Sequence, residues 1–564
     1  MPTTPRTFGT GSTRRASDRV NPVPKVGKAI GWGVLAAVPL LFLAVFFFVP
    51  VTGMIGRGLR PDGVWDLAGA WDVLTRARTA KVIGFTLFTA VVGTAITVAL
   101  GVPAAYCLYR LRLPGATLLR GLLVMPFVLP TVVVGVAFRT LLAESGPLGF
   151  LGLDGTPTAI IAALVFFNLS VVIRVVGTAW AGLDPRPEQA AASLGASPGE
   201  VFRTITLPSL RPAIISATSV VFLFCATAFG VVLTLGGVRY STIETEIYLL
   251  TTNFLDLQGA AVLSILQFVM VLVLLALVGR VRRDGAVSGQ PRPAPIRRSD
   301  AGPLLALLVC LVLVIAPLVT LVTRSLHVQG DWSLGNYRNL TSVTGDNALP
   351  VTVWQALSTS WRIAVDATLL AVVLGLIVAV LVSRRPRSRR ARRAVGLLDG
   401  VFMLPLGISA VTVGFGFLIT LDKPPFDFRD SVWLIPVAQA MVALPLVVRT
   451  LAPALRSVDQ RQREAAAALG ASPLRVALTV DVVAAWRPFL AAIGFALAVS
   501  LGEFGATSFL ARPDDPTLPV AIYQLIGHPG AANFGMALAA SVVLAAVTGT
   551  IMAGVDRLGG RTTL

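Results

Sequence analysis

Ionisable and amide side chains stand inside long apolar stretches of this chain, where they are the first candidates for chemistry. Glu503 lies in AVSLGEFGATSF, and Asp366 lies in WRIAVDATLLAVV with Arg362 one helical turn away. An ionisable group at such depth faces the interior of a helix bundle or a cavity. Glu503 is therefore either a polar group on a solute pathway or a structural hydrogen-bonding group. Arg362 predicts a structural ion pair with Asp366. Asn168 and Gln267 predict hydrogen bonds between helices, and Asn168 is a second candidate for the pathway.

Residues suited to covalent, metal or nucleotide chemistry are scarce. The sequence contains no G-x-x-x-x-G-K-[ST] motif for nucleotide phosphates and no H-E-x-x-H motif for zinc. The cysteines Cys107, Cys225 and Cys310 lie within apolar runs, and the two histidines, His327 and His528, lie in loops expected outside the membrane. We therefore expect no catalytic residue, metal or cofactor on this chain, which disfavours a membrane-embedded enzyme.

One polar stretch occurs twice between apolar segments. It reads EQAAASLGASPGEVFRTITLPSLRP at 188–212 and REAAAALGASPLRVALTVDVVAAWRP at 463–488. Alignment on LGASP places Gly195 opposite Gly470, which is 275 positions later. Because both copies have the same surroundings, an incidental amphipathic connector is a poor explanation.

The first copy predicts two short helices joined by a tight bend. Asp184 is a good N-cap with Pro185 at the first helical position. Gly195 ends the alanine-rich helix that follows. Ser197 then caps the second helix, and Glu200 three residues later completes a capping box.

The second copy repeats these signals with one change. Ser472 and Pro473 start its second helix, but Arg475 stands where the box needs a glutamate. Only half of the capping box is therefore expected. The small alanine and glycine residues of both hairpins would let another protein approach closely.

The pattern E-A-A, three residues, G, nine residues, I-x-L-P is similar to the cytoplasmic loop of permease subunits of bacterial ABC importers. In that family the loop is the coupling helix, which docks on the ATPase subunit. The first copy has Gln189 in place of the glutamate, with Glu188 one position early, and the second copy keeps Glu464. The resemblance implies a coupling role for Glu188, Gln189, Ala190, Ala191, Gly195, Ala196, Ser197, Pro198, Ile205, Leu207 and Pro208 in the first copy, and for Glu464, Ala465, Ala466, Gly470, Ala471, Ser472 and Pro473 in the second.

Composition places the chain in a membrane. Of its 564 residues, 55% are hydrophobic and only 13% are charged, against about 25% charged in an ordinary soluble domain. The net charge of +19 sits in short loops between apolar runs, so membrane topology explains it better than nucleic-acid binding.

The apolar runs predict an all-α polytopic membrane protein with twelve transmembrane helices. The resemblance implies that these are two tandem six-helix permease repeats. The domains expected are a disordered cytoplasmic tail (1–30), a first permease domain (31–280), a cytoplasmic linker (281–302) and a second permease domain (303–558). The predicted spans are 32–55, 82–108, 117–142, 158–182, 212–235 and 259–279, then 303–323, 357–383, 395–420, 432–452, 488–510 and 534–556.

Arginine placement predicts the orientation. Basic residues crowd the turns after 82–108 and 357–383 and the linker between the halves, while 143–157 has none. The positive-inside rule then puts both termini and both hairpins in the cytoplasm. The loop 56–81 is an exception, since it carries four arginines and Lys81. The expected location is the inner (plasma) membrane of a bacterium.

The halves match beyond the hairpins. MPFVLPTVVVGVAF (125–138) is similar to LPLGISAVTVGFGF (404–417), Phe229-Gly230 matches Phe504-Gly505, and STIETEIY (241–248) matches PTLPVAIY (516–523). Such a duplication predicts two halves related by a pseudo-two-fold axis along the membrane normal, with the solute pathway between them.

Several strings, such as VFFN (165–168) and WQALSTSWRIA (354–364), are closest to the thiamine branch of fused ABC importer permeases. Ferric iron or another small solute is the alternative cargo. An ion-coupled secondary transporter also uses internal repeats, but the paired hairpins and the few membrane carboxylates disfavour it. The resemblance implies three partners: an ATPase dimer that uses ATP and magnesium, an extracytoplasmic solute-binding protein, and membrane lipid. Nucleic acid is not expected.

Overall fold

The computed structural model describes residues 25–61, 63–281, 293–343, 349–383, 388–422, 427–428 and 431–559. Within these ranges the chain is helical, with one small strand hairpin of β1 (His327–Val328) and β2 (Asp331–Trp332). The predicted all-α class is confirmed. Helices are expected here because lipid offers no partners for backbone N–H and C=O groups.

The first half contains the following elements: α1 (Lys25–Leu43), η1 (Ala44–Phe48), α2 (Val49–Leu59), α3 (Leu67–Thr75), α4 (Ala77–Arg110), α5 (Ala116–Val124), η2 (Met125–Val128), α6 (Thr131–Leu142), η3 (Gly149–Leu151), α7 (Pro157–Ala181), α8 (Arg186–Ser193), α9 (Pro198–Val201), η4 (Phe202–Thr206), α10 (Leu207–Ala226), α11 (Gly230–Gly236), α12 (Ile243–Thr252) and α13 (Leu257–Val281).

The second half contains, besides the strands, these elements: η5 (Arg298–Asp300), α14 (Ala301–Ser325), α15 (Gly335–Asn339), α16 (Val353–Ser383), α17 (Arg389–Met403), η6 (Leu404–Gly407), α18 (Ala410–Thr420), α19 (Leu434–Ser457), α20 (Gln460–Ala468), α21 (Pro473–Val476), η7 (Ala477–Asp481), α22 (Val482–Ala484), α23 (Trp486–Gly502), α24 (Thr507–Leu510), α25 (Leu518–Gly527) and α26 (Ala531–Gly559).

Nine helices of the described residues are long and apolar enough to span a membrane, and two bent pairs raise that number to eleven. The predicted span 117–142 is one of these pairs, bent by 106° between Val128 and Thr131. Pro126 and Pro130 lie at this bend, and neither can donate a backbone hydrogen bond. The predicted span 395–420 is broken at the matching place into α17, η6 and α18. Eleven of the twelve predicted segments thus coincide with a helix or a bent pair.

Two predicted spans are interrupted near their ends. The span 212–235 is not continuous, because α10 ends at Ala226 and α11 begins at Gly230. In the second half α23 ends at Gly502 and α24 begins at Thr507, which interrupts the predicted span 488–510. The breaks fall at Phe229-Gly230 and Phe504-Gly505, the dipeptides that match between the halves.

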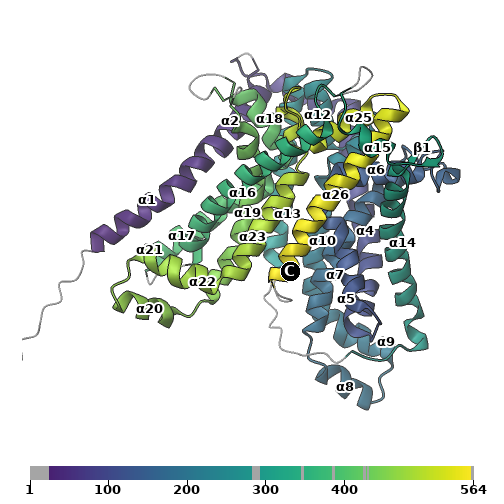
Figure 1. The fold of residues 1–564 in the computed structure, drawn as a ribbon. Helices are drawn as coiled ribbons and strands as arrows, with labels where there is room; N and C mark the ends of the chain where they lie inside the picture. The colour runs from purple at the N-terminus through teal and green to yellow at the C-terminus, as the bar shows by residue number, and fades with distance from the viewer. Residues whose placement is uncertain are drawn as a thin grey trace, which may run out of the picture.

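The two halves stand side by side (Figure 1), and each accepts the first long helix of the other. Helix α1 packs against α16 of the second half, whereas α14 packs against α4 and α6 of the first. The end of the linker is tied to the first half as well, because Leu111 and Ala294 form a parallel bridge. The predicted tail and linker lie outside the described residues over 1–24 and 282–292.

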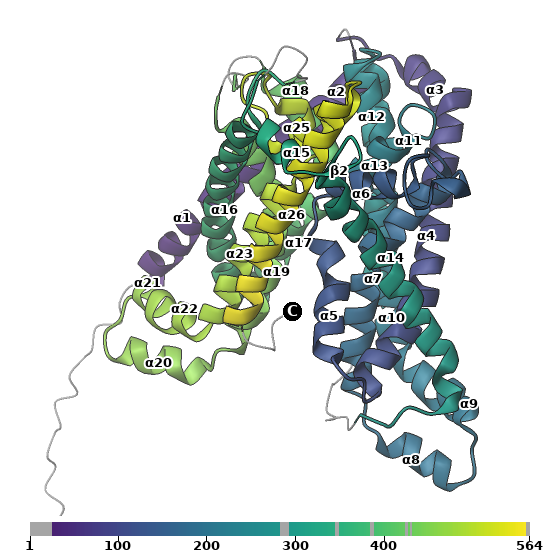
Figure 2. The same ribbon diagram turned by 45° about the vertical axis from the view of Figure 1, so that its right-hand side comes forward.

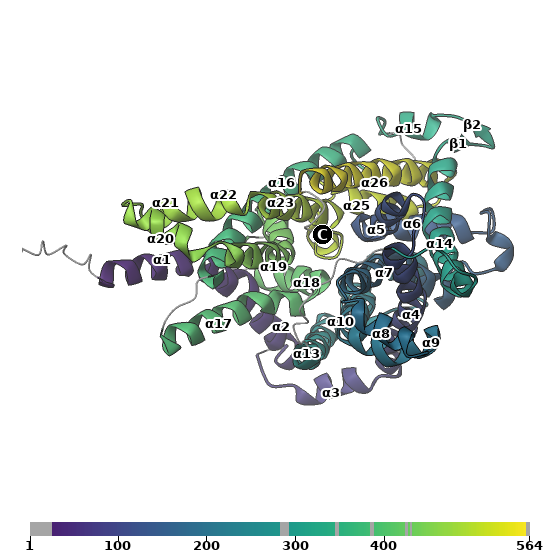
Figure 3. The same ribbon diagram turned by 90° about the horizontal axis from the view of Figure 1, so that it is seen from below.

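The two polar hairpins lie at one end of the molecule, and a second group of short helices lies at the opposite end. Helices α8, α9 and α20–α22 form the hairpin end at the bottom of Figure 1, and α12, α15, α18 and α25 form the distal end at its top. Figure 2 shows the halves close together at the distal end and farther apart toward the hairpins. Seen from the hairpin end in Figure 3, the two hairpins lie on separate halves.

Candidate functional site: paired hairpins and the interface between the repeats

The first hairpin begins almost where its sequence predicts. Helix α8 begins at Arg186, one residue later than expected, with Pro185 as its N-cap. The Asp184 carboxylate nevertheless accepts a bond of 3.0 Å from the Arg186 N–H. This bond satisfies one of the N–H groups that a helix start leaves without a partner.

Both alanine-rich helices end in the same Schellman motif. Gly195 has φ +90° and Gly470 has φ +86°. Ala196 N–H donates to Ala191 O at 3.1 Å, and Ala471 N–H donates to Ala466 O at 3.1 Å. A left-handed residue at this position normally requires glycine, so both bends are fixed by the sequence itself.

The caps of the second helices differ as predicted. The Ser197 N–H donates to Glu200 at 2.7 Å and Glu200 N–H donates to the Ser197 hydroxyl at 3.4 Å, so the box is complete. In the other hairpin Arg475 N–H donates to Ser472 Oγ at 3.3 Å, which is half of the box. Pro473 is the first residue of α21. A π-helical turn follows in each copy, η4 and η7.

An interaction that the sequence did not suggest ties each hairpin to its own half. Glu188 accepts from Arg110 at the end of α4 and, at 2.8 Å, from the Thr206 hydroxyl. At the equivalent positions Arg463 forms an ion pair of 2.6 Å with Asp481. Residues 188 and 206 align with 463 and 481, so the same two positions hold both hairpins with different chemistry. Position-by-position alignment of the copies could have shown this pairing.

The opposite face of each hairpin is open. Gln189, Ala190, Glu464 and Ala465 are exposed. Leu194 and Leu469, the residues before the bend glycines, are each 89% exposed. Ile205 lies in η4, and Leu207 and Pro208 begin α10. Each hairpin therefore presents small residues and a protruding leucine before its bend, and the second hairpin also exposes Leu474.

The two pathway candidates lie in different surroundings. Glu503 accepts from Ala506 N–H at 2.8 Å, from Thr507 N–H at 3.1 Å and from the Thr507 hydroxyl, so its carboxylate caps α24. It is buried beside Phe504. Asn168 is buried within the first half, where its amide donates to Leu164 O at 2.9 Å and to Cys225 Sγ at 3.5 Å. These contacts show structural bonding for both residues, and a role in the pathway stays a prediction.

Glu244 is a buried carboxylate that sequence reasoning missed. It lies in the first turn of α12, it has no exposed surface, and it accepts a bond of 2.7 Å from Ser409 Oγ of the second half. Ser409 also caps α18 through Thr412 N–H at 3.1 Å. This contact joins the two halves at the distal end.

Four matched rings cross the interface between the halves, and we call them the aromatic row: Tyr248, Phe229, Phe504 and Tyr523. The ring centroids are 5.5, 5.3 and 5.4 Å apart in that order. The two central rings, Phe229 and Phe504, are stacked at 22°. Each is followed by a glycine at the helix break, and an added Cβ on Gly230 would lie 2.3 Å from Thr131 Oγ1. The breaks therefore bring the two rings face to face.

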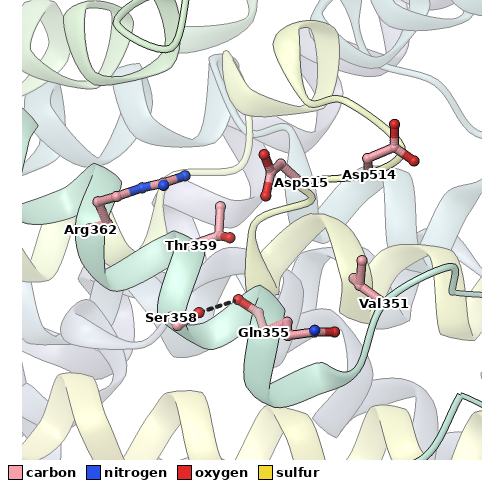
Figure 4. Close-up of a pocket in the computed structure, with 7 residues that line it drawn as sticks. All are labelled: Val351, Gln355, Ser358, Thr359, Arg362, Asp514 and Asp515. Atoms are coloured by element: carbon pink, nitrogen blue, oxygen red, sulfur yellow. Dashed lines mark hydrogen bonds between the residues drawn. The ribbon is translucent and has the colours of Figure 1, made fainter.

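Two cavities open at the distal end. One, of about 380 Å³, lies between α16 and the loop before α25 and is lined by Arg362, Asp514 and Asp515 (Figure 4). The expected Arg362–Asp366 ion pair is wrong: the described ion pairs do not include it. In Figure 4 the Arg362 side chain extends toward the loop that carries the two aspartates.

The other cavity, of about 280 Å³, lies at the aromatic row, where Tyr248, Phe504 and Tyr523 line it.

Gln267 confirms the expected bond between helices, because its amide donates to Ala226 O at 3.4 Å.

The similarity of this chain to known proteins extends over both repeats. The family model of binding-protein-dependent transport system inner membrane components matches residues 97–283 and again 371–562. The thiamine transport system permease protein ThiP of Escherichia coli (strain K12) is 28% identical over 509 residues, covering 88% of this chain and 89% of that protein. ThiP of Salmonella typhimurium is 29% identical over 476 residues, covering 82% and 86%.

Partial matches are also found. The sulfate transport system permease protein CysT of Salmonella typhimurium is 31% identical over 213 residues, covering 37% of this chain and 76% of that protein. A crystal structure of a bacterial ABC transporter for the import of alginate aligns with a TM-score of 0.40 and 18% identity, covering 46% of this chain and 98% of that chain. The family model, by contrast, covers both halves with the hairpins inside each match. The chain is therefore a multi-pass inner membrane protein with two fused repeats, and it belongs to the family of binding-protein-dependent transport system inner membrane components.

Proposed function

We propose that this permease carries thiamine. The observation that supports this cargo is the extent of the likeness to thiamine permeases. It runs through both repeats over 88% of the chain, whereas the likeness to a sulfate permease covers 37%. Ferric iron is the competing cargo in the experiment below.

The hairpins are the proposed docking sites for two ATPase subunits. Each hairpin is fixed by a Schellman bend and by an anchor to its own half, while its small residues and the leucine before its bend face outward. Rigid presentation reduces the entropy that docking would otherwise cost. The partner ATPase would use ATP and magnesium, and ATP hydrolysis on that partner would move the two halves through the hairpins.

We place the hairpin end in the cytoplasm. The arginine-rich turns support this orientation. The exceptional basic loop at the distal end is partly neutralised, because Arg76 forms an ion pair of 2.8 Å with Asp256 and Arg78 pairs with Glu246. The positive-inside rule counts Lys and Arg and gives Asp and Glu little weight, so this loop remains an exception to the orientation that the other loops support. Both termini then lie in the cytoplasm.

The distal end is the proposed face for a solute-binding protein, a partner type that the family description supplies. Solute released there would meet the interface between the halves, where the aromatic row and Glu244 lie.

The test is a competition experiment on the complete importer. The permease, its ATPase and its binding protein are reconstituted in liposomes. Uptake of labelled thiamine is measured with unlabelled thiamine or ferric iron as competitor, and uptake of labelled ferric iron is measured in parallel. We expect ATP-dependent uptake that thiamine suppresses and ferric iron does not. Uptake of iron in place of thiamine would reject the cargo while keeping the importer.

A further inference from the structure

The smaller distal cavity stands directly on the aromatic row. Tyr248 from α12, Phe504 from the break before α24 and Tyr523 from α25 all line it. Three of the four rings of the row therefore face one cavity, and the fourth ring, Phe229, stacks against Phe504. Phe504 belongs to both the lining and the stacked pair. A molecule in this cavity would therefore touch a ring of the Phe229–Phe504 contact that joins the halves.

The chemistry of the lining is distinctive. Besides the rings, the polar lining groups are Ser508, Gln524 and His528, and no Lys, Arg, Asp or Glu of the described residues lines the cavity. The neighbouring larger cavity contrasts with it, since Arg362, Asp514 and Asp515 line that one. Ring faces attract cations through the aromatic quadrupole and do so most strongly where water is partly removed. A volume of about 280 Å³ is just below the ~300–1,000 Å³ typical of small-molecule pockets.

We propose that this cavity is a binding site for a planar organic cation, which rests on the three rings that line it. The cation binds there while the Phe229–Phe504 pair is still stacked, and the pair separates afterwards. The rings supply the cation–π attraction, and the Ser508 hydroxyl and Gln524 amide supply neutral hydrogen-bonding groups to the rest of the solute. Thiamine has this chemistry, because it carries a permanently charged thiazolium ring and a second flat ring. Its identity as the cation rests on the proposed function.

The repeat symmetry supports a shared role for the two tyrosines. Tyr248 and Tyr523 occupy matching positions 275 residues apart, and each packs against the matching phenylalanine of its own half. Separation of the halves would move the two tyrosines apart together with the stacked pair. A cation held between them would then lose its site as the barrier opens.

The experiment measures protection of an introduced thiol in the full permease–ATPase complex in nanodiscs. Cys107, Cys225 and Cys310 are replaced by alanine, and Ser508→Cys places one thiol in the cavity lining. The rate of N-ethylmaleimide labelling is measured against thiamine concentration and against thiochrome, its uncharged oxidation product. Ser358→Cys, in the lining of the larger cavity, is the matched control.

We expect thiamine to slow labelling at position 508 and not at 358, and thiochrome to protect far less. Tyr523→Leu should weaken the protection constant about fivefold, equivalent to about 1 kcal/mol, whereas Tyr523→Phe keeps the ring and should stay within about twofold. Equal protection in the Leu and Phe variants, or equal protection by thiochrome, would overturn the site.

The outcomes also separate this site from the proposed cargo. If the complete importer takes up thiamine but thiamine gives no protection at position 508, the site is wrong and the importer stands. If ring-dependent protection is found in a complex that imports no thiamine, the site stands and the cargo is wrong.

Discussion

The anchor of the second hairpin gives the sharpest energetic prediction. The Arg463 side chain is 8% exposed and its partner Asp481 is 2% exposed, with 2.6 Å between them. Besides Asp481, Arg463 donates to Leu455 O and Val458 O and to the Gln460 side chain. All three of these acceptors are neutral. Asp481→Leu therefore leaves a buried guanidinium without its counter-charge.

Removal of one partner of a buried ion pair costs about 3–5 kcal/mol, whereas replacement of both by apolar residues is close to neutral. We expect Asp481→Leu to destabilise the packed hairpin by that amount. The double variant Arg463→Met/Asp481→Leu should recover most of the loss. Arg461→Met, on an exposed residue of the same helix, is the control and should change stability by less than about 0.5 kcal/mol.

Amide hydrogen exchange of α20 in the purified complex measures this opening directly. A loss of 3 kcal/mol or more in local stability lowers the protection of its amides by about 100-fold or more. ATPase affinity should fall in the single variant and return in the double variant. Wild-type protection in Asp481→Leu, or equal loss in the single and double variants, would refute the anchor.

Three further predictions concern the hairpins and their orientation. Gly195→Ala and Gly470→Ala should each destabilise the bend by about 1–2 kcal/mol, because both glycines have positive φ while nothing lies within 4 Å of an added Cβ; thermal denaturation should show a smaller loss for Asn at the same positions. Glu464→Gln should weaken ATPase binding more than Gln189→Ala at low salt, since only Glu464 can make a charged contact with a basic residue of the ATPase. Equal losses of affinity that do not depend on salt would indicate that packing alone holds the interface. Cysteines at Ser299 and Ser145 should be labelled from opposite sides of the membrane; labelling of both from outside would reject the orientation.

Local chemistry made much of the fold predictable. Apolar runs gave the helices, because a backbone in lipid must bond to itself. The hairpins were predicted in detail, since the caps at Ser197 and Ser472 and the bends at Gly195 and Gly470 depend on residues a few positions apart. The half capping box followed from a single substitution, Arg475.

Contacts between distant segments were not predictable in the same way. The exchange of α1 and α14 between the halves depends on packing choices that no single helix contains. The Arg362–Asp366 pair was expected from spacing, yet Arg362 faces a cavity formed with the loop of Asp514 and Asp515. Glu244 was missed because its partner, Ser409, lies 165 residues away. The anchors at 188 and 463 escaped notice because the two copies use different side chains there.

The proposed coupling through the hairpins is tested most directly by ATP-driven thiamine uptake in the reconstituted importer when the glycines of both hairpin bends are replaced. Gly195→Trp together with Gly470→Trp places bulk on the proposed docking face and forces a large residue into positive φ. We expect normal membrane insertion, lost ATPase association and lost uptake, with the wild type taking up thiamine only when ATP is present. Near-normal uptake and ATPase association in the double variant would contradict it.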